Sequence, residues 1–344
     1  MAKRIVFFNN KGGVGKTTMV YHTAYMLAEL GYKVVVADFD PQTNLTAMFL
    51  SQKRLEEIFL QDNTDEFYNG VTTIVDMMRP VIEGEGIPIV QTEPIIRSLF
   101  GENIHLLVGN LALSMYEDNL SSAWTGCLNR DTYSFKVTNL FHYILTTAEA
   151  QTQADFTLID IGPNLGAINR NVLIASDYVV LPVGSDLFSL RGIENLGRTL
   201  QKWRAGWAKR IKEWEEGKKE KPTSIKLELP QKQMKPIGYV ALQHTAQESR
   251  PVKAYLKWSD RIPKTYKTFV LEQSSNEIME VEQDSNCLGL LKHYHSLMPM
   301  AMEARKPIFA LKPADGAIGA HSQSVRKVYD DFKKVTLRIL DACK

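Results

Sequence analysis

The chain has 344 residues, enough to bury a sizeable hydrophobic core as one α/β domain or as a domain with an insertion. Its 41 lysines and arginines nearly balance its 39 aspartates and glutamates, so any nucleic-acid contact would need a local basic patch. The 3 cysteines, Cys127, Cys287 and Cys343, are far apart, which argues against disulfides, zinc and iron–sulfur clusters. No signal peptide precedes the first apolar run and no apolar segment reaches membrane-spanning length, so we expect a cytoplasmic protein without stable membrane insertion.

The first candidate functional element is a glycine-rich loop near the N-terminus. The apolar run Arg4–Phe8 predicts a buried strand before it, and residues 19–30 have the periodicity of a helix that ends at Gly31. Between them stands Lys11-Gly12-Gly13-Val14-Gly15-Lys16-Thr17-Thr18. A strand, a glycine-rich loop and a helix in this order are typical of a phosphate-binding loop, in which backbone N–H groups and the helix N-terminus bind phosphate oxygens.

The chemistry of this loop predicts roles for two side chains. Lys16 would contact the β- and γ-phosphates of ATP, and the hydroxyl of Thr17 would bind Mg²⁺. With Lys11 as an additional early lysine, the loop resembles the deviant Walker A box of the ParA/MinD family of P-loop ATPases. The resemblance implies that residues 11–18 bind ATP, and that Lys11 reaches across an ATP-dependent homodimer to the phosphates of the partner. The alternative is that Lys11 is an ordinary solvated lysine.

A pair of carboxylates follows the next predicted strand. The run Tyr32–Asp38 reads as buried, and Pro41 ends it, so Asp40 should lie at the loop mouth where open α/β sheets bind ligands. The segment Asp38-Phe39-Asp40-Pro41-Gln42 resembles the ParA family, which implies that Asp40 positions the attacking water; Asp38 is less clearly assigned. The alternative for Asp40 is a helix cap.

Residues 51–103 are predicted to form an insertion, because the related ATPases have a shorter connection there. A helix is expected at Val71–Arg79, between loops rich in polar residues and glycine. The chain then returns to strand character at Ile104–Val108, and the following Gly109–Leu113 resembles a loop that comes after the third strand in the family. The sequence does not say what the insertion contacts.

A second metal-binding side chain is predicted further along. After a helix expected at Phe135–Ala148, the apolar strand Phe156–Asp160 ends in a carboxylate, which is the Walker B arrangement. Asp160 would hold Mg²⁺ through water, because magnesium keeps much of its hydration shell. The continuation 161–166 resembles the family's switch segment, although Gly162 replaces the usual proline and Asn164 the usual serine.

Two further strands, Tyr178–Val183 and Pro236–Leu242, flank a charged segment at about 204–235 that contains tryptophans. Basic residues interleaved with aromatics can bind nucleic acid, but a charged, extended helix end followed by a loop is the simpler explanation, and we favour it. Beyond Gln243 more basic residues follow, namely Arg250, Lys253, Lys257, Arg261, Lys264 and Lys267. They could contact DNA phosphates without sequence specificity, as partition ATPases do, or form a solvated helix face.

The last helix is amphipathic. Its apolar residues are Val325, Val328, Phe332, Val335 and Ile339, all on one face. A membrane-targeting helix of MinD type is conceivable, but Asp330, Asp331 and Asp341 make it a poor ligand for anionic lipid, so we expect it to dock on the protein. The preceding segment, Arg305–Phe309 and 315–320, resembles the family's ending near the nucleotide base.

Together these features predict a single α/β domain over residues 1–344, a doubly wound, mainly parallel sheet of the deviant Walker A P-loop NTPase type. The resemblance implies Mg²⁺-dependent ATP hydrolysis by in-line attack of water, with Lys11, Lys16 and Asp40 as catalytic residues. The first hypothesis is a ParA-type switch that dimerises on ATP, binds DNA nonspecifically near the nucleoid, and works with a ParB-like adaptor to position DNA. A MinD-like membrane-surface ATPase and a regulatory or defence module acting on protein partners are the alternatives.

Overall fold

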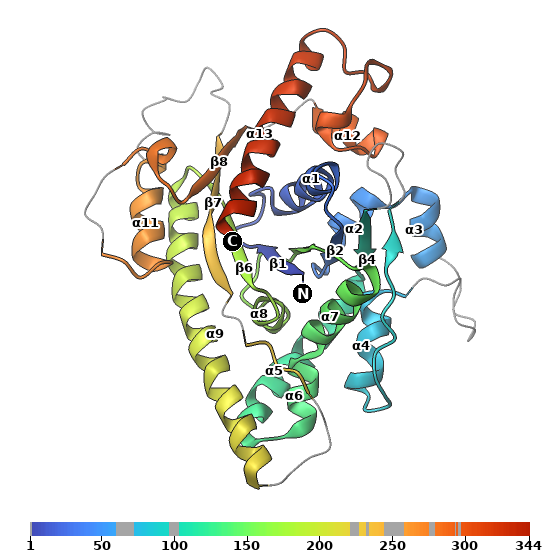
Figure 1. Cartoon of the computed structure of the whole chain (residues 1–344), viewed down its shortest axis with the longest axis vertical. Coiled ribbons are helices and arrows are strands. Elements are labelled where there is room, and N and C mark those ends of the chain that lie inside the picture. The colour runs from blue at the N-terminus through green and yellow to red at the C-terminus, as the bar shows by residue number, and fades with distance from the viewer. Residues whose placement is uncertain are drawn as a thin grey trace.

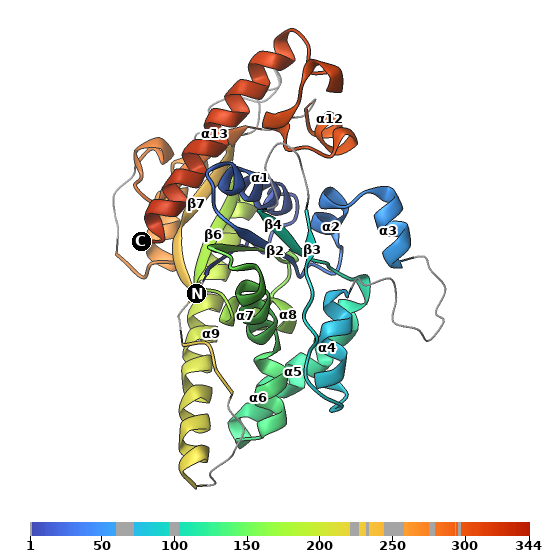
Figure 2. The same ribbon diagram turned by 45° about the vertical axis from the view of Figure 1, so that its right-hand side comes forward.

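The molecule is organised around one sheet with helices on both faces (Figures 1 and 2). This computed structural model describes residues 2–59, 72–95, 103–220, 227–231, 234–243, 258–274, 279–292, 294 and 297–344. Within these residues the sheet has 8 strands in the order β3-β4-β2-β5-β1-β6-β7-β8. The strands are β1 (Lys3–Phe7), β2 (Val34–Asp38), β3 (Glu93–Pro94), β4 (Ile104–Leu107), β5 (Phe156–Asp160), β6 (Tyr178–Gly184), β7 (Lys235–Gln243) and β8 (Cys287–Lys292).

Neighbouring strands run parallel except for the short edge strand β3, which pairs antiparallel with β4. The strands β2 and β5 are buried at every position, as expected for a parallel sheet covered on both faces. The register pairs Phe7 with Asp160 and Asp38 with Asp160, so the last residues of β1, β2 and β5 lie side by side. The loops that follow these strands therefore meet at one edge, which is where open α/β sheets bind ligands.

Two layers of helices bury the two faces of the sheet. One layer contains α1 (Lys16–Glu29), α2 (Asn44–Phe49), α12 (Leu297–Ala304) and α13 (Ala320–Ala342). The other contains α4 (Ile74–Ile82), α5 (Glu117–Gly126), α6 (Thr132–Thr138), α7 (Leu140–Thr152), α8 (Ala167–Ile174), α9 (Leu187–Glu220) and α11 (Ile262–Phe269). The remaining described helix, α3 (Gln52–Phe59), follows α2.

Short 3₁₀ turns connect several of these elements. They are η1 (Leu111–Tyr116), η2 (Cys127–Asn129), η3 (Val281–Gln283), η4 (Ile308–Ala310) and η5 (Pro313–Asp315). Among them η1 leads directly into α5, and η4 packs against α13.

The doubly wound, mainly parallel fold predicted from the sequence is confirmed, with differences in detail. The helix predicted at 135–148 is wrong as a single helix, because Asn139 ends α6 and begins α7, and its amide donates to the carbonyl of Glu228. The helix expected at 71–79 begins at Ile74, after a capping box between Thr73 and Asp76. Strands β3 and β8 were not predicted.

The charged segment that begins near residue 204 belongs to the long helix α9, which extends past the sheet and packs against α5 and α6 (Figure 1). Trp203, Trp207 and Trp214 are buried along it, and the Trp207 indole donates to the carbonyl of Pro230. Buried rings cannot stack on bases, so these tryptophans belong to the core. The simpler explanation, a charged helix end, holds as far as Glu220, while residues 221–226 lie outside the described part.

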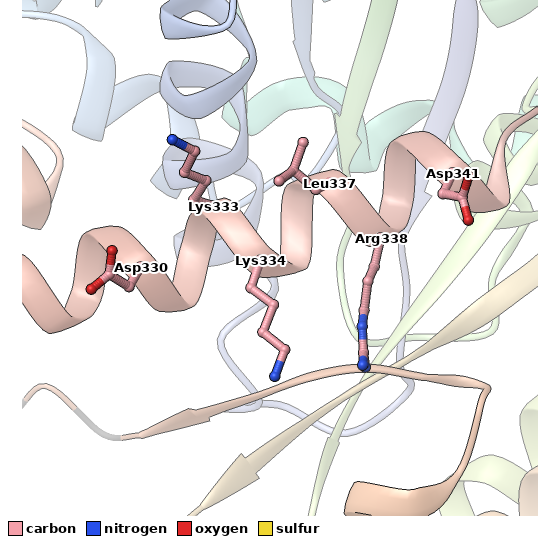
Figure 3. A pocket seen from close by; sticks show the side chains of 6 residues that line it. All are labelled: Asp330, Lys333, Lys334, Leu337, Arg338 and Asp341. Carbon is pink, nitrogen blue, oxygen red and sulfur yellow. The ribbon is translucent and has the colours of Figure 1, made fainter.

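The amphipathic C-terminal helix α13 docks on the protein, as expected. Val328, Phe332, Val335 and Ile339 are buried against α1 and β8. A hollow along this helix is lined by Asp330, Lys333, Lys334, Leu337, Arg338 and Asp341, all from α13 itself (Figure 3). Because all of the described residues that line it come from this one helix, we interpret this hollow as a helix surface and not as a ligand cleft. None of the described helices is long and apolar enough to cross a membrane.

Candidate functional site: a phosphate-binding loop with strand-end carboxylates

The glycine-rich loop links β1 to α1 and has the backbone that a phosphate cradle needs. Gly13 and Gly15 have φ values of 72° and 68°, in the left-handed region where a side chain would be strained. Nothing lies within 4 Å of the position that a Cβ on Gly12 or Gly13 would take, so the loop opens outward. Gly15 is the N-cap of α1 and places the positive helix end behind the loop.

Lys16 lies inside this loop. Its side chain is buried, and its Nζ donates to the backbone carbonyls of Asn9 at 3.2 Å and Lys11 at 3.5 Å. Burial lowers the pKa of Lys16, while the charges of Asp160 and Asp40 oppose that shift. These two carbonyls hold the ammonium group inside the loop, where phosphate oxygens would bind. Phosphate oxygens could replace the carbonyls as its hydrogen-bond acceptors.

Thr17 and Asp160 meet as the sequence predicts. The Thr17 hydroxyl donates to Asp160 Oδ2 at 2.6 Å, and the buried Asp160 Oδ1 has no hydrogen-bond partner among the described residues. Burial first, and then the charge of Asp38, raise the pKa of Asp160 well above its usual value. A divalent cation would give Asp160 Oδ1 a partner and would offset the repulsion between Asp160 and Asp38. These residues therefore fit hydrated Mg²⁺.

Asp40 lies beside this pair at the mouth of the site. Its Oδ1 accepts from the backbone N–H of Gln42 at 3.0 Å, and a Cβ on Gly162 would lie 3.3 Å from the same oxygen. The glycine at 162 therefore leaves room for Asp40 in the loop after β5. The segment 161–166, which resembles the switch segment of the family, therefore adjoins Asp40, the carboxylate expected to position the attacking water.

Asp38 has a different role from Asp40. It is fully buried, and its Oδ2 accepts from Thr46 N at 2.8 Å and from Thr46 Oγ1 at 2.7 Å. Thr46 Oγ1 in turn accepts from Gly109 N, and a Cβ on Gly109 would collide with Asp38. Burial raises the pKa of Asp38 to about 7. This carboxyl joins α2 to the loop after β4, a contact that the sequence alone did not reveal.

The side chain of Lys11 contacts two residues at the start of α9. Its Nζ lies 2.5 Å from Asp186 Oδ2 and 3.3 Å from Ser189 Oγ, and about one third of each charged side chain is exposed. Asp186 also accepts from Phe188 N and Ser189 N at the start of α9. Although burial acts to raise it, the pKa of Asp186 is lowered overall by the hydrogen bonds from Lys11 and Ser189. Sequence reasoning missed Asp186, whose signal was the Asp-x-x-Ser spacing of a helix cap.

His22 connects the phosphate loop helix to the C-terminal part of the chain. It is fully buried; Nδ1 donates to the carbonyl of Thr18 at 2.7 Å, and Nε2 accepts from Ile308 N at 3.0 Å. These partners require a neutral ring with the proton on Nδ1. The ring stacks on Phe332 of α13 at 4.7 Å between centroids. Burial lowers its pKa to about 4.

This histidine makes stability depend on pH. As pH falls from 6.5 toward 4, the unfolded chain binds a proton that the folded chain excludes, so His22 costs stability in this window. We expect the free energy of unfolding of wild type to fall by ~1.4 kcal/mol per pH unit relative to His22→Gln. Chemical denaturation of both proteins at several pH values between 4.5 and 7.5 measures the difference.

The comparison with His22→Gln is needed because Asp38 acts in the opposite direction. The pKa of Asp38 in the folded protein, about 7, lies above the usual value, so its contribution to the free energy of unfolding rises as pH falls through 7. In wild type this rise partly offsets the loss that is due to His22. The difference between the two proteins cancels the Asp38 contribution, since Asp38 is present in both. Parallel curves for wild type and His22→Gln would contradict a neutral, buried imidazole.

Comparison with known proteins agrees with this geometry. A family model described as an AAA domain matches residues 2–212. The chain is 26% identical over 206 residues to the chromosome-partitioning ATPase Soj of Treponema pallidum, covering 60% of this chain and 66% of Soj. The chain thus spans slightly less than two thirds of the length of that relative.

Solved structures resemble the whole chain. The protein DIP2308 from Corynebacterium diphtheriae has a TM-score of 0.74 and 25% identity over 99% of this chain and 98% of its own. A plasmid partition protein from Borrelia burgdorferi has a TM-score of 0.52 and 15% identity, covering 98% and 99% of the two chains, which supports the fold alone. With the family match over residues 2–212, the loop of Lys11–Thr18 and the strand-end Asp160, the chain belongs to the ParA/MinD family of P-loop ATPases.

Proposed function

We propose that this protein is a Mg²⁺-dependent ATPase that dimerises on binding ATP and holds DNA nonspecifically, in order to position plasmid or chromosomal DNA. The observation that carries the proposal is the contact of the Lys11 side chain with Asp186 and Ser189, which follow β6. Paired with Asp186 and about one third exposed, Lys11 would be able to exchange this partner for the phosphates of a second subunit. Partition proteins among the relatives support the DNA-positioning role.

The proposed reaction needs few side chains, because phosphoryl transfer to water is catalysed mainly by positioning and by charge. Lys16 would neutralise the β- and γ-phosphates, and Thr17 and Asp160 would hold the metal. Bound Mg²⁺ supplies charge compensation for the phosphate oxygens. Asp40 would orient the attacking water and accept its proton, as its place beside the loop and Gly162 allows.

Exposed apolar side chains around the site support a face-to-face dimer. Leu111 and Met115 follow β4, Leu165 follows β5, and Phe188 follows β6, so all lie near the edge of the sheet that carries the phosphate loop. Met115 and Phe188 are 76% and 75% exposed. A second copy placed over this edge would cover apolar surface and bring its own Lys11 toward the site.

Basic side chains on α9 and α11 support a DNA surface. Arg198, Lys202 and Lys209 are exposed on α9, and Lys264 is exposed on α11, which packs against α9. Spacings of four and seven residues place the three α9 residues on one side of the helix. Arg250, Lys253 and Lys257, also predicted to be basic contacts, lie outside the described residues.

A module that acts through protein partners is the second candidate. Ile87 and Ile89 are 73% and 61% exposed in the region predicted as an insertion, and such neighbouring apolar side chains can bind another protein. In that case ATP would serve as a structural switch, and DNA would not bind in any nucleotide state. The membrane-surface alternative is weakened, since the apolar face of α13 is buried.

The dimer is tested with Lys11→Ala in an Asp40→Ala background, where slow hydrolysis lets any ATP-bound dimer accumulate. Size-exclusion chromatography with light scattering, in ATP and Mg²⁺, should show a dimer for Asp40→Ala and a monomer for the double variant. Because Lys11 lies off its own site, monomeric ATP binding should change less than about threefold. Asp186→Asn in the same background is the control: it loses the ion pair with Lys11, keeps an amide oxygen that can cap the start of α9, and should still dimerise.

DNA retention should follow the dimer. Doubling the basic surface roughly doubles the phosphate contacts, so the log of the affinity should fall more steeply with the log of salt concentration. Replacing Arg198 and Lys202 by alanine should reduce that slope by roughly 0.9 for each lost contact. An equal amount of dimer in Asp40→Ala and in the double variant would contradict a role of Lys11 at the site of the partner. Absence of DNA binding in every nucleotide state would favour the protein-partner module.

A further inference from the structure

Glu117, the first residue of α5, caps a helix to which it does not belong. Its carboxylate accepts hydrogen bonds from the backbone N–H groups of Ala167 and Ile168, the latter at 3.1 Å. These are the first residues of α8, and the N-cap of α8 is Gly166, which has no side chain to offer. Neither the local sequence of α8 nor any pattern near Glu117 signals this contact.

The geometry of Gly166 shows that the contact is close. A Cβ at this position would collide with Glu117 Oε1 and would lie 3.1 Å from Asn164 Oδ1. Asn164 Oδ1 accepts from Gly166 N at 3.1 Å, and Asn169 Nδ2 of α8 donates to the carbonyls of Gly162 and Asn164 at 2.7 Å each. The loop between β5 and α8 is therefore fastened to the first turns of α8.

This loop reaches the reacting end of the nucleotide site. It begins directly after Asp160, and Gly162 adjoins Asp40 Oδ1, where a Cβ would be 3.3 Å from the carboxylate oxygen. A shift of α8 would move Gly162, because Asn169 holds the Gly162 carbonyl. The position of α8 thus sets the space available to the Asp40 carboxylate.

The helix that carries Glu117 is itself anchored. The Trp124 ring of α5 lies 3.6 Å from the Arg210 guanidinium carbon of α9 and 4.5 Å from that of Arg170 in α8. Arg210 Nε also donates to the carbonyl of Trp124 at 2.6 Å. Because α9 holds α5 in this way, the Glu117 carboxylate is a fixed point against which α8 is placed.

We propose that Glu117 is a positioning residue for ATP hydrolysis: by capping α8 it holds the loop 161–166 against Asp40 in the arrangement that orients the attacking water. The inference rests on the proposed role of Asp40. Glu117 does not touch the site itself, so its loss leaves the phosphate loop, Thr17 and Asp160 in place. It therefore affects turnover and not ATP affinity.

The first test compares Glu117→Ala and the isosteric Glu117→Gln with Asp118→Asn, a neighbouring exposed control with the same loss of charge. Turnover of ATP by Glu117→Ala should fall by about tenfold to a hundredfold, as small misplacements near reacting groups do, with KM and the ATP dissociation constant changed less than about twofold. Glu117→Gln keeps one acceptor and should be intermediate. Hydrogen exchange at Ala167 and Ile168 should accelerate while that at Val172 is unchanged.

The second test is a double variant, Glu117→Ala with Asp40→Ala. If Glu117 acts through Asp40, the double variant should be no slower than Asp40→Ala alone. The inference would be overturned if the double variant lost turnover by the product of the two single losses. It would also be overturned if Glu117→Ala had unchanged turnover, or if that variant lost turnover, ATP affinity and melting temperature together. Wild-type turnover is measured first: its absence would remove the proposed function and this role together, whereas active wild type with an equally active Glu117→Ala removes this role alone.

Discussion

Lys16→Ala is expected to abolish ATP binding, with the dissociation constant rising at least about a hundredfold, or ~3 kcal/mol. The Lys16 ammonium is already buried in the loop, on the carbonyls of Asn9 and Lys11. Contact with phosphate therefore adds little desolvation cost, and removing the cation leaves the phosphate charge facing Asp40 and Asp160. Titration calorimetry with ATP and Mg²⁺ measures the loss.

Lys33→Ala is the matched control for this experiment. Lys33 is exposed just before β2 and donates to Gln153, far along the strand from the loop mouth. It should bind ATP like wild type, and both variants should unfold at nearly the wild-type temperature. Wild-type affinity in Lys16→Ala would overturn the assignment of residues 11–18 as the phosphate-binding loop.

Asp40→Ala is expected to keep ATP and Mg²⁺ binding while turnover falls by roughly a hundredfold or more, the usual contribution of a general base. The carboxylate is proposed to act on water and therefore to stabilise the transition state more than the bound substrate. Steady-state turnover and calorimetric ATP affinity, measured on the same preparation, separate the two effects.

Asp40→Asn refines this experiment. The amide oxygen can still accept from Gln42 N, so the loop should keep its shape while the base is lost. Slow turnover in both variants would assign the effect to the carboxylate charge. Slow turnover in Asp40→Ala alone would assign it to the loop, and unchanged turnover in both would remove Asp40 from the mechanism.

The contrast between these two experiments separates binding from chemistry. Lys16 contacts charge that is present before and after the reaction, so its loss should appear in affinity. Asp40 meets charge that develops during attack by water, so its loss should appear in turnover. Loss of both ATP affinity and turnover in Asp40→Ala would indicate a collapsed loop instead of a missing catalytic group.

The sequence located the phosphate loop and Asp160 because their determinants are local. Glycines between an apolar strand and a helix specify the cradle, and an apolar run ending in a carboxylate specifies the position of Asp160 at the sheet edge. Parallel strands expose their carboxyl ends at one edge, so the meeting of Thr17 and Asp160 at 2.6 Å could be expected before the structure was known. The doubly wound sheet follows from the same alternation of strands and helices.

Local patterns were less informative where two interpretations shared one composition. Tryptophans among basic residues fit both a nucleic-acid surface and a buried helix face, and only packing against α5 and α6 placed the rings inside. The helical periodicity of 135–148 continues across Asn139, although α6 ends and α7 begins at this residue.

Tertiary structure alone decided the contacts that join distant parts of the chain. Lys11 reaches Asp186, 175 residues away, and His22 receives the N–H of Ile308, 286 residues away. Glu117 caps a helix that begins 50 residues later. Each contact satisfies a charge or a backbone donor at the end of an element, and its partner is chosen by which elements the fold brings together. A sequence pattern can show that a helix such as α8 lacks a cap of its own, but only the packed structure supplies the residue that caps it.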